Sequence, residues 1–239
     1  MKKFVKLIIC LIILFSISIT SYANDINDIL SALQKAKFSE KEELLSEIAN
    51  IKSMKSLTIL KYIESGSLYY IKSNKKNVYA KKIDKNYQLT DLTTGENLGE
   101  VKKNKIKRIS LNNKLRKHIR LLIAKSSLIS EDKKVRISAA KIIFDSQSLE
   151  LLPLISTALN KEKDASVLKE LYRTQSRLYL LSEDKLLINK SLDYLADTTD
   201  PEILSVVREF IEKYKNKNVF DEELNKAEAL IKKINNNLK

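Results

Sequence analysis

The chain has 239 residues, 44% of them hydrophobic and 31% charged, which excludes a disordered or fibrous protein. With three Gly and two Pro, the chain can have neither a glycine-rich phosphate loop nor a turn-rich all-β fold. One Cys and one His are too few for a zinc or iron–sulfur site. We therefore expect a mainly α protein without a cofactor. The formal net charge of +14 would indicate nucleic acid as a partner if the chain stayed in the cytoplasm.

Residues 1–23 have the features of a secretory signal peptide. Three lysines among the first six residues precede an apolar run over residues 7–15, and Ser21 and Ala23 occupy the −3 and −1 positions that signal peptidase prefers. We expect cleavage before Asn24, which would remove the single cysteine and place the chain in the periplasm, either free or against the inner membrane. Export also leaves no nucleic acid as a partner. The alternative is an uncleaved N-terminal anchor, since the uncharged stretch is just long enough to span a bilayer.

The region of residues 24–110 begins with helical patterns. Apolar residues at helical spacing predict helices around residues 26–33, 44–51 and 57–63. Ser39 is the predicted N-cap of the second helix, because acidic residues follow it in the first turn.

The same region continues with strands. Runs rich in β-forming residues, separated by polar turns, predict a small inserted antiparallel β ribbon. All three glycines fall in this part of the chain, where positive φ angles are needed. Asp91 and Glu96 could form a carboxylate pair, but no base or metal-ligand cluster accompanies them, so we interpret them as part of a solvated turn. The predicted strands cover residues 68–71, 77–80, 87–90 and 98–101.

The region of residues 111–239 contains no glycine and predicts only helices. Seven segments in succession carry apolar residues at positions i, i+3, i+4 and i+7. An internal repeat links two of them, because the sequence of residues 128–133 returns at residues 180–185 with an offset of 52. A fixed period of this kind is typical of an α-solenoid. Asp132, Arg136 and their neighbours also resemble the HEAT consensus, so we predict HEAT-like helical repeats.

The longest charge run lies where the two regions join. Residues 101–125 contain ten basic side chains and no acidic one. One interpretation is docking to a partner or to anionic lipid headgroups, and the other is a solvated helix face. His118 lies within the run, and we assign it no catalytic role. The candidate basic residues for a membrane or partner surface are Lys102, Lys103, Lys105, Lys107, Arg108, Lys114, Lys117 and Arg120.

Part of this sequence resembles a known family. Residues 87–101 read Tyr-Gln-Leu-Thr-Asp-Leu-Thr-Thr-Gly-Glu-Asn-Leu-Gly-Glu-Val, and residues 109–116 read Ile-Ser-Leu-Asn-Asn-Lys-Leu-Arg. Their order is similar to that in the N-terminal extramembrane extension of the permease subunit of the urea ABC transporter, a permease of the branched-chain amino acid type. That extension also begins with an export signal and continues into HEAT-like repeats. The residues that carry the motif are Asp91, Thr94, Gly95, Glu96, Gly99, Asn112, Asn113, Leu115 and Arg116.

The resemblance implies a non-catalytic periplasmic domain that supports urea uptake by protein–protein docking. Its partners would be the membrane subunit of the transporter, the urea-binding protein and, across the membrane, the two ATPase subunits. In the family a multi-span membrane domain follows the extension, whereas this sequence ends at Lys239. The chain is therefore either a separately encoded extension or a fragment of a longer permease. Without pore-forming spans, we expect no transport by this polypeptide alone.

Two other functions remain open. One is a free exported helical-repeat scaffold or adaptor that is unrelated to urea. The other is an enzyme on a helical-repeat scaffold. Three absences argue against it: the sequence has no cysteine nucleophile after cleavage, no supported Ser/His/Asp arrangement and no metal-ligand cluster. We therefore expect no enzymatic activity.

Overall fold

The computed structural model describes residues 26–196 and 200–237, and the predicted signal peptide lies outside them. Ten α-helices and one five-stranded antiparallel sheet make up the described residues, which confirms the mainly α prediction. The chain divides into two compact units, which meet in sequence between Ile119 and Arg120, whereas the sequence analysis placed a boundary after residue 110. In the part that the structure covers, no helix is long and apolar enough to cross a membrane.

Unit 1 opens with the three predicted helices, α2 (Ile26–Lys35), α3 (Phe38–Asn50) and α4 (Met54–Glu64). The predicted N-cap at Ser39 is wrong, because α3 already begins at Phe38. The Glu40 carboxylate accepts a hydrogen bond from the Lys37 N–H at 2.9 Å, which satisfies one of the free donors at the helix start.

The predicted ribbon is a larger sheet than the sequence indicated. Its strand order is β4-β3-β2-β1-β5, with every neighbouring pair antiparallel. The strand missed by the sequence analysis is β5, a three-residue strand that pairs with β1 and follows a single turn of 3-10 helix, η1 (Lys103–Lys105). The strands are β1 (Leu68–Ile71), β2 (Asn77–Ile83), β3 (Asn86–Asp91), β4 (Asn97–Lys102) and β5 (Ile106–Arg108).

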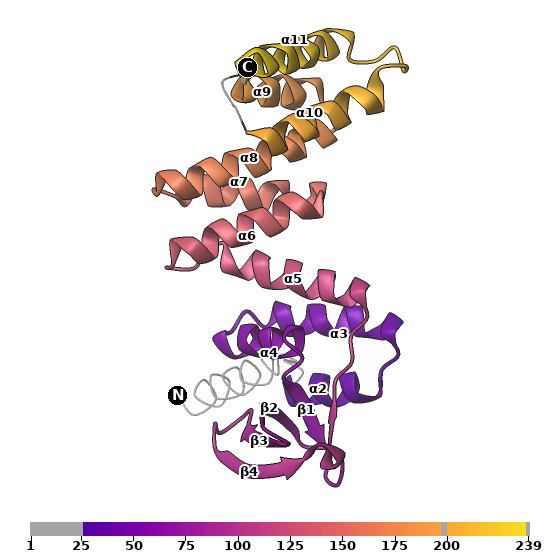
Figure 1. The fold of residues 1–239 in the computed structure, drawn as a ribbon, viewed down its shortest axis with the longest axis vertical. Coiled ribbons are helices and arrows are strands. Elements are labelled where there is room, and N and C mark those ends of the chain that lie inside the picture. The colour runs from indigo at the N-terminus through magenta and orange to yellow at the C-terminus, as the bar shows by residue number, and fades with distance from the viewer. Residues whose placement is uncertain (1–25, 197–199, 238–239) are drawn as a thin grey trace, which may run out of the picture. The chain divides into compact units, whose positions relative to one another are not determined.

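Helices α2 and α4 contact the sheet (Figure 1). Gln34 of α2 donates hydrogen bonds to the Lys75 carbonyl at 2.8 Å and to the Asn77 side chain at 2.9 Å. On α4, the ring of Tyr62 packs against that of Tyr79 with centroids 4.4 Å apart. A separate apolar cluster within the sheet is formed by Val78, Ala80, Leu89 and Ile106.

All seven helices predicted after residue 111 are present. The first, α5, crosses the division between the two units, and the others follow in unit 2 with short connections (Figure 1). In unit 2, α8 contacts α6, α7, α9 and α10, and α11 contacts α9 and α10. The bounds are α5 (Asn113–Ser127), α6 (Lys133–Ser146), α7 (Leu152–Lys161), α8 (Ala165–Leu181), α9 (Lys185–Leu195), α10 (Pro201–Tyr214) and α11 (Asp221–Asn237).

Candidate functional site

The first group of motif residues forms the turn between β3 and β4. The buried Asp91 carboxylate accepts hydrogen bonds from the N–H groups of Thr93 at 2.6 Å and Thr94 at 3.0 Å, and pairs with the Lys76 ammonium at 2.5 Å. The bond from Lys76, followed by those from the two backbone N–H groups, lowers the pKa of Asp91 to about 2. Glu96 is exposed and meets Asp91 through the backbone, where its carbonyl accepts from the Asp91 N–H at 2.9 Å. The turn is held by its own polar groups.

The two motif glycines nearby have backbone conformations that other residues adopt only with strain. Gly95 has a φ of 74° and Gly99 a φ of 83°, and neither has an atom close to the position where a Cβ would stand. They are therefore required by conformation alone rather than by a close neighbour.

The second group of motif residues starts α5. The Asn112 side chain accepts a hydrogen bond from the Leu115 N–H at 2.9 Å, as an N-cap does, and Asn113 is the first helical residue. Leu115 is buried, and Arg116 donates to the Glu64 carbonyl at the end of α4 at 3.4 Å. These residues therefore connect the start of α5 to the helices of unit 1.

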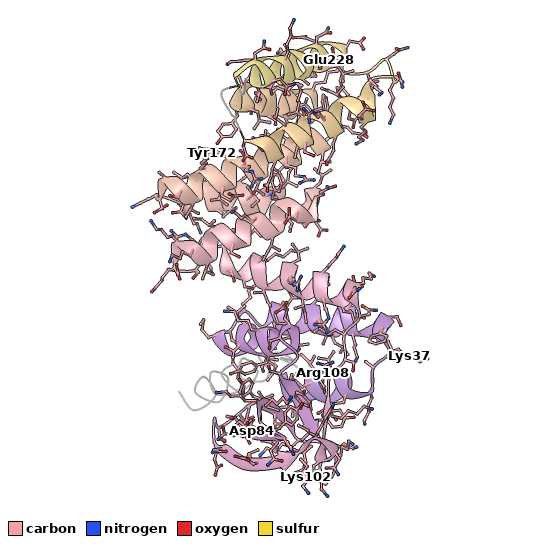
Figure 2. The ribbon with its side chains drawn as sticks, in the orientation of Figure 1. Lys37, Asp84, Lys102, Arg108, Tyr172 and Glu228 are labelled. Atoms are coloured by element: carbon pink, nitrogen blue, oxygen red, sulfur yellow. The ribbon has the colours of Figure 1, made fainter. Side chains whose placement is uncertain are left out.

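The structure divides the predicted basic run into two halves with different surroundings. In the half on α5, Lys114 pairs with Glu42 at 2.6 Å and Lys125 lies 3.9 Å from Glu150. Acidic residues distant in sequence thus compensate part of this half, while Lys117 and Arg120 are exposed. The other half lies at the sheet, where Lys102 is seen near the end of β4 (Figure 2). It consists of Lys102, Lys103, Lys105, Lys107 and Arg108, all exposed.

Two lysines that the sequence analysis did not select join the sheet half. The Lys72 N–H donates to the Lys105 carbonyl at 2.9 Å, which extends the pairing of β1 with β5. Lys107 lies directly opposite Tyr70 in the same pairing, and the Lys75 ammonium lies 5.5 Å from the centroid of the Tyr70 ring. Strand pairing is the signal that could have found them, but β5 was not predicted.

A buried lysine from α3 completes the group. The Lys41 ammonium donates to the Ser110 carbonyl at 3.0 Å. Burial, and then the positive charge of Lys107, lowers the pKa of Lys41, so the two ammonium groups are close enough to repel each other. We call Lys41, Lys72, Lys75, Lys105 and Lys107 the lysine cluster. Among the described residues, none of the five forms an ion pair with an acidic side chain.

An exposed aromatic ring borders the lysine cluster. Phe38, the first residue of α3, is 50% exposed, and the Lys41 ammonium lies 5.3 Å from the centroid of its ring. An exposed large apolar side chain is unremarkable alone, but here it adjoins uncompensated positive charge. Ring and cluster together make up the strongest candidate surface of unit 1.

His118 lies in a different polar group, between α3 and α5. Its Nε2 is 2.9 Å from the Ser46 hydroxyl, and its Nδ1 is 3.9 Å from a Glu42 carboxylate oxygen. This order of groups resembles a Ser-His-Glu triad. However, the Ser46 hydroxyl also lies 2.9 Å from the Glu42 carbonyl of its own helix, which competes with the imidazole for the hydroxyl proton. The geometry favours a structural contact between the two helices.

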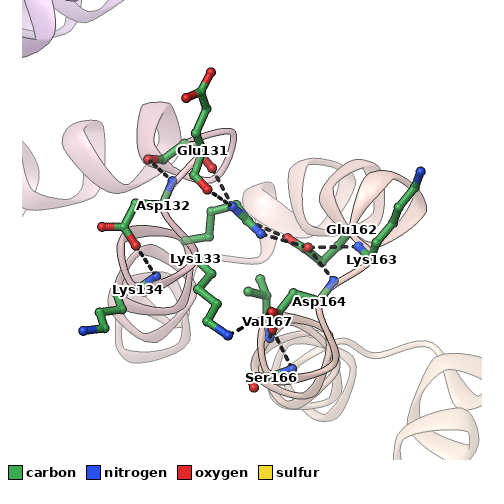
Figure 3. A network of polar contacts seen from close by, with 11 residues as sticks. Glu131, Asp132, Lys133, Lys134, Glu162, Lys163, Asp164, Ser166 and Val167 are labelled. Carbon is green, nitrogen blue, oxygen red and sulfur yellow. Dashed lines mark hydrogen bonds and ion pairs between the residues drawn. The ribbon is translucent and has the colours of Figure 1, made fainter.

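In unit 2, Arg136, one of the residues that resembled the HEAT consensus, is the centre of a polar network. Figure 3 shows its partners Glu131 and Glu162 together with the neighbouring helix caps. Its guanidinium binds both Glu162 carboxylate oxygens, at 2.6 and 3.0 Å, and donates to the carbonyls of Ser130 at 2.7 Å and Glu131 at 2.9 Å. The pKa of Glu162 is lowered by this partner, and the pKa of Arg136 is raised. Arg136 therefore connects α6 to the loop that precedes it and to the residue that follows α7.

The two copies of the internal repeat share their helix caps. Asp132 accepts from the Lys134 N–H at 2.8 Å, and Asp184 accepts from the Leu186 N–H at 2.8 Å and the Leu187 N–H at 3.2 Å. Where the first copy has Arg136, the second has Ile188, which is fully buried. The repeat thus keeps the cap and replaces the polar network by apolar packing.

Among the described residues, no group of three or more His, Cys, Asp and Glu side chains is placed to hold a metal ion. Comparisons with models of known protein families, with curated proteins and with solved structures find no match for this chain.

Proposed function

We propose that this chain is a non-catalytic, exported docking protein built on HEAT-like helical repeats, which serves as the extramembrane part of a urea ABC transporter permease. The observation that carries the proposal is the recurrence of whole elements at the period of the sequence repeat. Helix α8 begins 52 residues after α5, α9 begins 52 residues after α6, and α10 begins 52 residues after the 3-10 turn η2 (Leu149–Leu151). Repeated helices stacked on their neighbours are the architecture of extended binding surfaces.

The packing of unit 2 supports the solenoid part of this proposal. Each of the helices α6 to α10 contacts the next one or the next but one along the chain, as stacked helix pairs do. Two apolar clusters follow each other along unit 2, one from Ala124 to Leu178 and one from Phe144 to Ile234. Such a stack buries the apolar face of each helix against its sequence neighbours and leaves the outer faces for partners.

The partners follow from the resemblance. They are the membrane subunit of the transporter and the urea-binding protein, and the chain would act by docking them rather than by binding urea. The signal-like residues 1–23 support a periplasmic location. A free exported scaffold unrelated to urea is the competing function, and urea-limited growth separates the two, since a deletion strain that lacks only a free scaffold would grow normally.

An aromatic pair marks a contact point for a protein partner on unit 2. Tyr172 of α8 and Tyr194 of α9 have ring centroids 5.3 Å apart, and they are 41% and 44% exposed. Tyrosine is enriched in protein interfaces because it combines a large apolar area with a polar tip. Figure 2 shows Tyr172 at the surface of unit 2.

Co-purification of the tagged chain from solubilised membranes tests the proposal. We expect transporter components to be recovered with the native chain and reduced by the Tyr172→Ala, Tyr194→Ala double variant. Ile129→Ala, which truncates another exposed apolar residue of unit 2, is the matched control and should not reduce recovery. Recovery of the native chain without any transporter component would refute the proposal.

A further inference from the structure

We propose that the lysine cluster and Phe38 form a surface that binds anionic phospholipid headgroups. The inference rests on the proposed function in one respect, namely that the chain works next to a membrane. Everything else in it comes from the charges, contacts and exposure of unit 1.

Most of the excess positive charge lies in unit 1. Residues 26–119 contain 20 basic and 10 acidic side chains, whereas residues 120–239 contain 21 basic and 19 acidic ones. A general bias toward lysine in the sequence would charge both units alike. The imbalance therefore belongs to the unit that carries the sheet.

Within unit 1, the fold gathers positive charge from separate segments. The β1–β2 turn supplies Lys72 and Lys75, the segment of η1 and β5 supplies Lys105 and Lys107, and α3 supplies Lys41. The pairing of β1 with β5 puts the first two segments side by side. Lys41 is held next to them because its ammonium donates to the Ser110 carbonyl at 3.0 Å, three residues after Lys107. Mutual repulsion opposes this arrangement, and an anionic surface would relieve it.

The composition of the surface favours a lipid bilayer over other anions. The four exposed cations of the cluster, Lys72, Lys75, Lys105 and Lys107, are lysines. Their flexible, strongly hydrated ammonium groups suit a diffuse layer of headgroup phosphates, whereas fixed carboxylates or nucleic-acid phosphates favour arginine. An exposed phenylalanine beside lysines is typical of segments that lie in the membrane interface. Phe38 would enter the headgroup region while Lys72, Lys75, Lys105 and Lys107 contact the phosphates.

Sedimentation of the full purified chain with lipid vesicles tests this surface. We compare vesicles of phosphatidylcholine alone with vesicles of phosphatidylcholine and phosphatidylglycerol in about a seven to three ratio, at low and at physiological salt. Because each lysine near an anionic membrane strengthens binding about fivefold, the quadruple variant Lys72→Gln, Lys75→Gln, Lys105→Gln, Lys107→Gln should bind the anionic vesicles at least tenfold more weakly.

The matched control removes the same charge from unit 2. Lys134, Lys141, Lys169 and Lys190 are exposed, and their replacement by Gln should leave vesicle binding unchanged. Any contribution of residues 1–23 is the same in all three proteins, so it cancels in the comparison. Equal loss in both quadruple variants, equal binding to neutral vesicles, or no binding to anionic vesicles would overturn the proposal, as would tighter binding to a short oligonucleotide than to the vesicles.

Fluorescence tests the position of Phe38 directly. The chain has no tryptophan, so Phe38→Trp introduces a single reporter. Anionic vesicles should shift its emission to shorter wavelength, whereas Leu186→Trp, at a 74% exposed position of unit 2, should show no shift. A shift in neither variant would show that Phe38 stays in water. The vesicle and fluorescence experiments use only the purified chain and lipid. The lipid-binding proposal can therefore fail while co-purification with the transporter succeeds, and it can succeed while co-purification fails.

Discussion

Lys76 in the β1–β2 turn and Asp91 at the end of β3 form an ion pair 2.5 Å long, which closes one end of the sheet. Asp91 also holds the β3–β4 turn through two backbone N–H groups. One carboxylate thus connects two turns of the sheet. The ammonium group of Lys76 and the N–H groups of Thr93 and Thr94 all require an acceptor at position 91, and an aspartate carboxylate provides it.

Replacing Asp91 should destabilise unit 1. We expect Asp91→Asn to lower the free energy of unfolding by about 1–2 kcal/mol, because the amide loses the ion pair and accepts the N–H bonds less strongly. Urea denaturation followed by circular dichroism measures the change. Asp84→Asn, at an exposed turn position with a φ of 50°, is the control and should change stability by less than about 0.5 kcal/mol.

The same carboxylate predicts a dependence on pH. The pKa of Asp91 is about 2 in the folded chain, below its ordinary value of 3.8, so its contribution is complete above about pH 4 and is lost as the pH falls toward 2. The contribution is about 1 kcal/mol, because the half-exposed Lys76 is screened by water. The stability difference between the native chain and Asp91→Asn should therefore shrink over this range. A difference that stays constant from pH 5 to pH 2 would contradict the assignment.

The two repeat copies should respond alike to loss of their caps. Asp132→Ala and Asp184→Ala each remove the side chain that accepts from the first helical N–H groups, so each should destabilise by about 0.5–2 kcal/mol. Glu131→Ala removes a neighbouring acid whose side chain caps nothing, and it serves as the control. If only one of the two variants lowers the free energy of unfolding, the two copies are similar in sequence but not in how their helices are stabilised.

The Arg136–Glu162 contact should show strong coupling. Both side chains are mostly buried, at 16% and 8% exposure, and each single replacement strands the other charge. A double-mutant cycle with Arg136→Met and Glu162→Gln should give a coupling energy of about 1–3 kcal/mol in unfolding experiments. Lys133→Met removes the more exposed pair with Asp164 and should cost less than about 0.5 kcal/mol.

The contact between Ser46 and His118 should be structural. We expect Ser46→Ala to destabilise unit 1 by about 1 kcal/mol, because the imidazole loses its hydrogen bond to the Ser46 hydroxyl. Hydrolysis of a simple ester should be the same for the native chain and the variant. Ser31→Ala, which removes an exposed serine bonded only to its own helix, is the control for both measurements. Loss of hydrolysis with Ser46→Ala would instead show an active serine.

The sequence by itself determined the helices and most strands of this protein. Their signals are local, because apolar residues at helical spacing and alternating β-forming runs report the face that each element buries. The caps Asp132 and Asp184 act within one turn of their own helices, and the repeat places both at equivalent positions of the sequence. The start of α3 was misplaced because Lys37 occupies the N-cap position, where the Glu40 carboxylate accepts from its N–H, so the predicted serine lies inside the helix.

Only the tertiary structure decided which charges face one another. Strand β5 is three residues long and two of them, Lys107 and Arg108, are basic, so its own sequence does not predict a strand. It is stable because β1 pairs with it. That pairing brings Lys72 and Lys75 to Lys105 and Lys107, while folding places Glu42 against Lys114. A run of charge in the sequence shows how many cations a segment has. Whether they are compensated depends on distances across the fold, because electrostatic interaction weakens with separation in space and not along the chain.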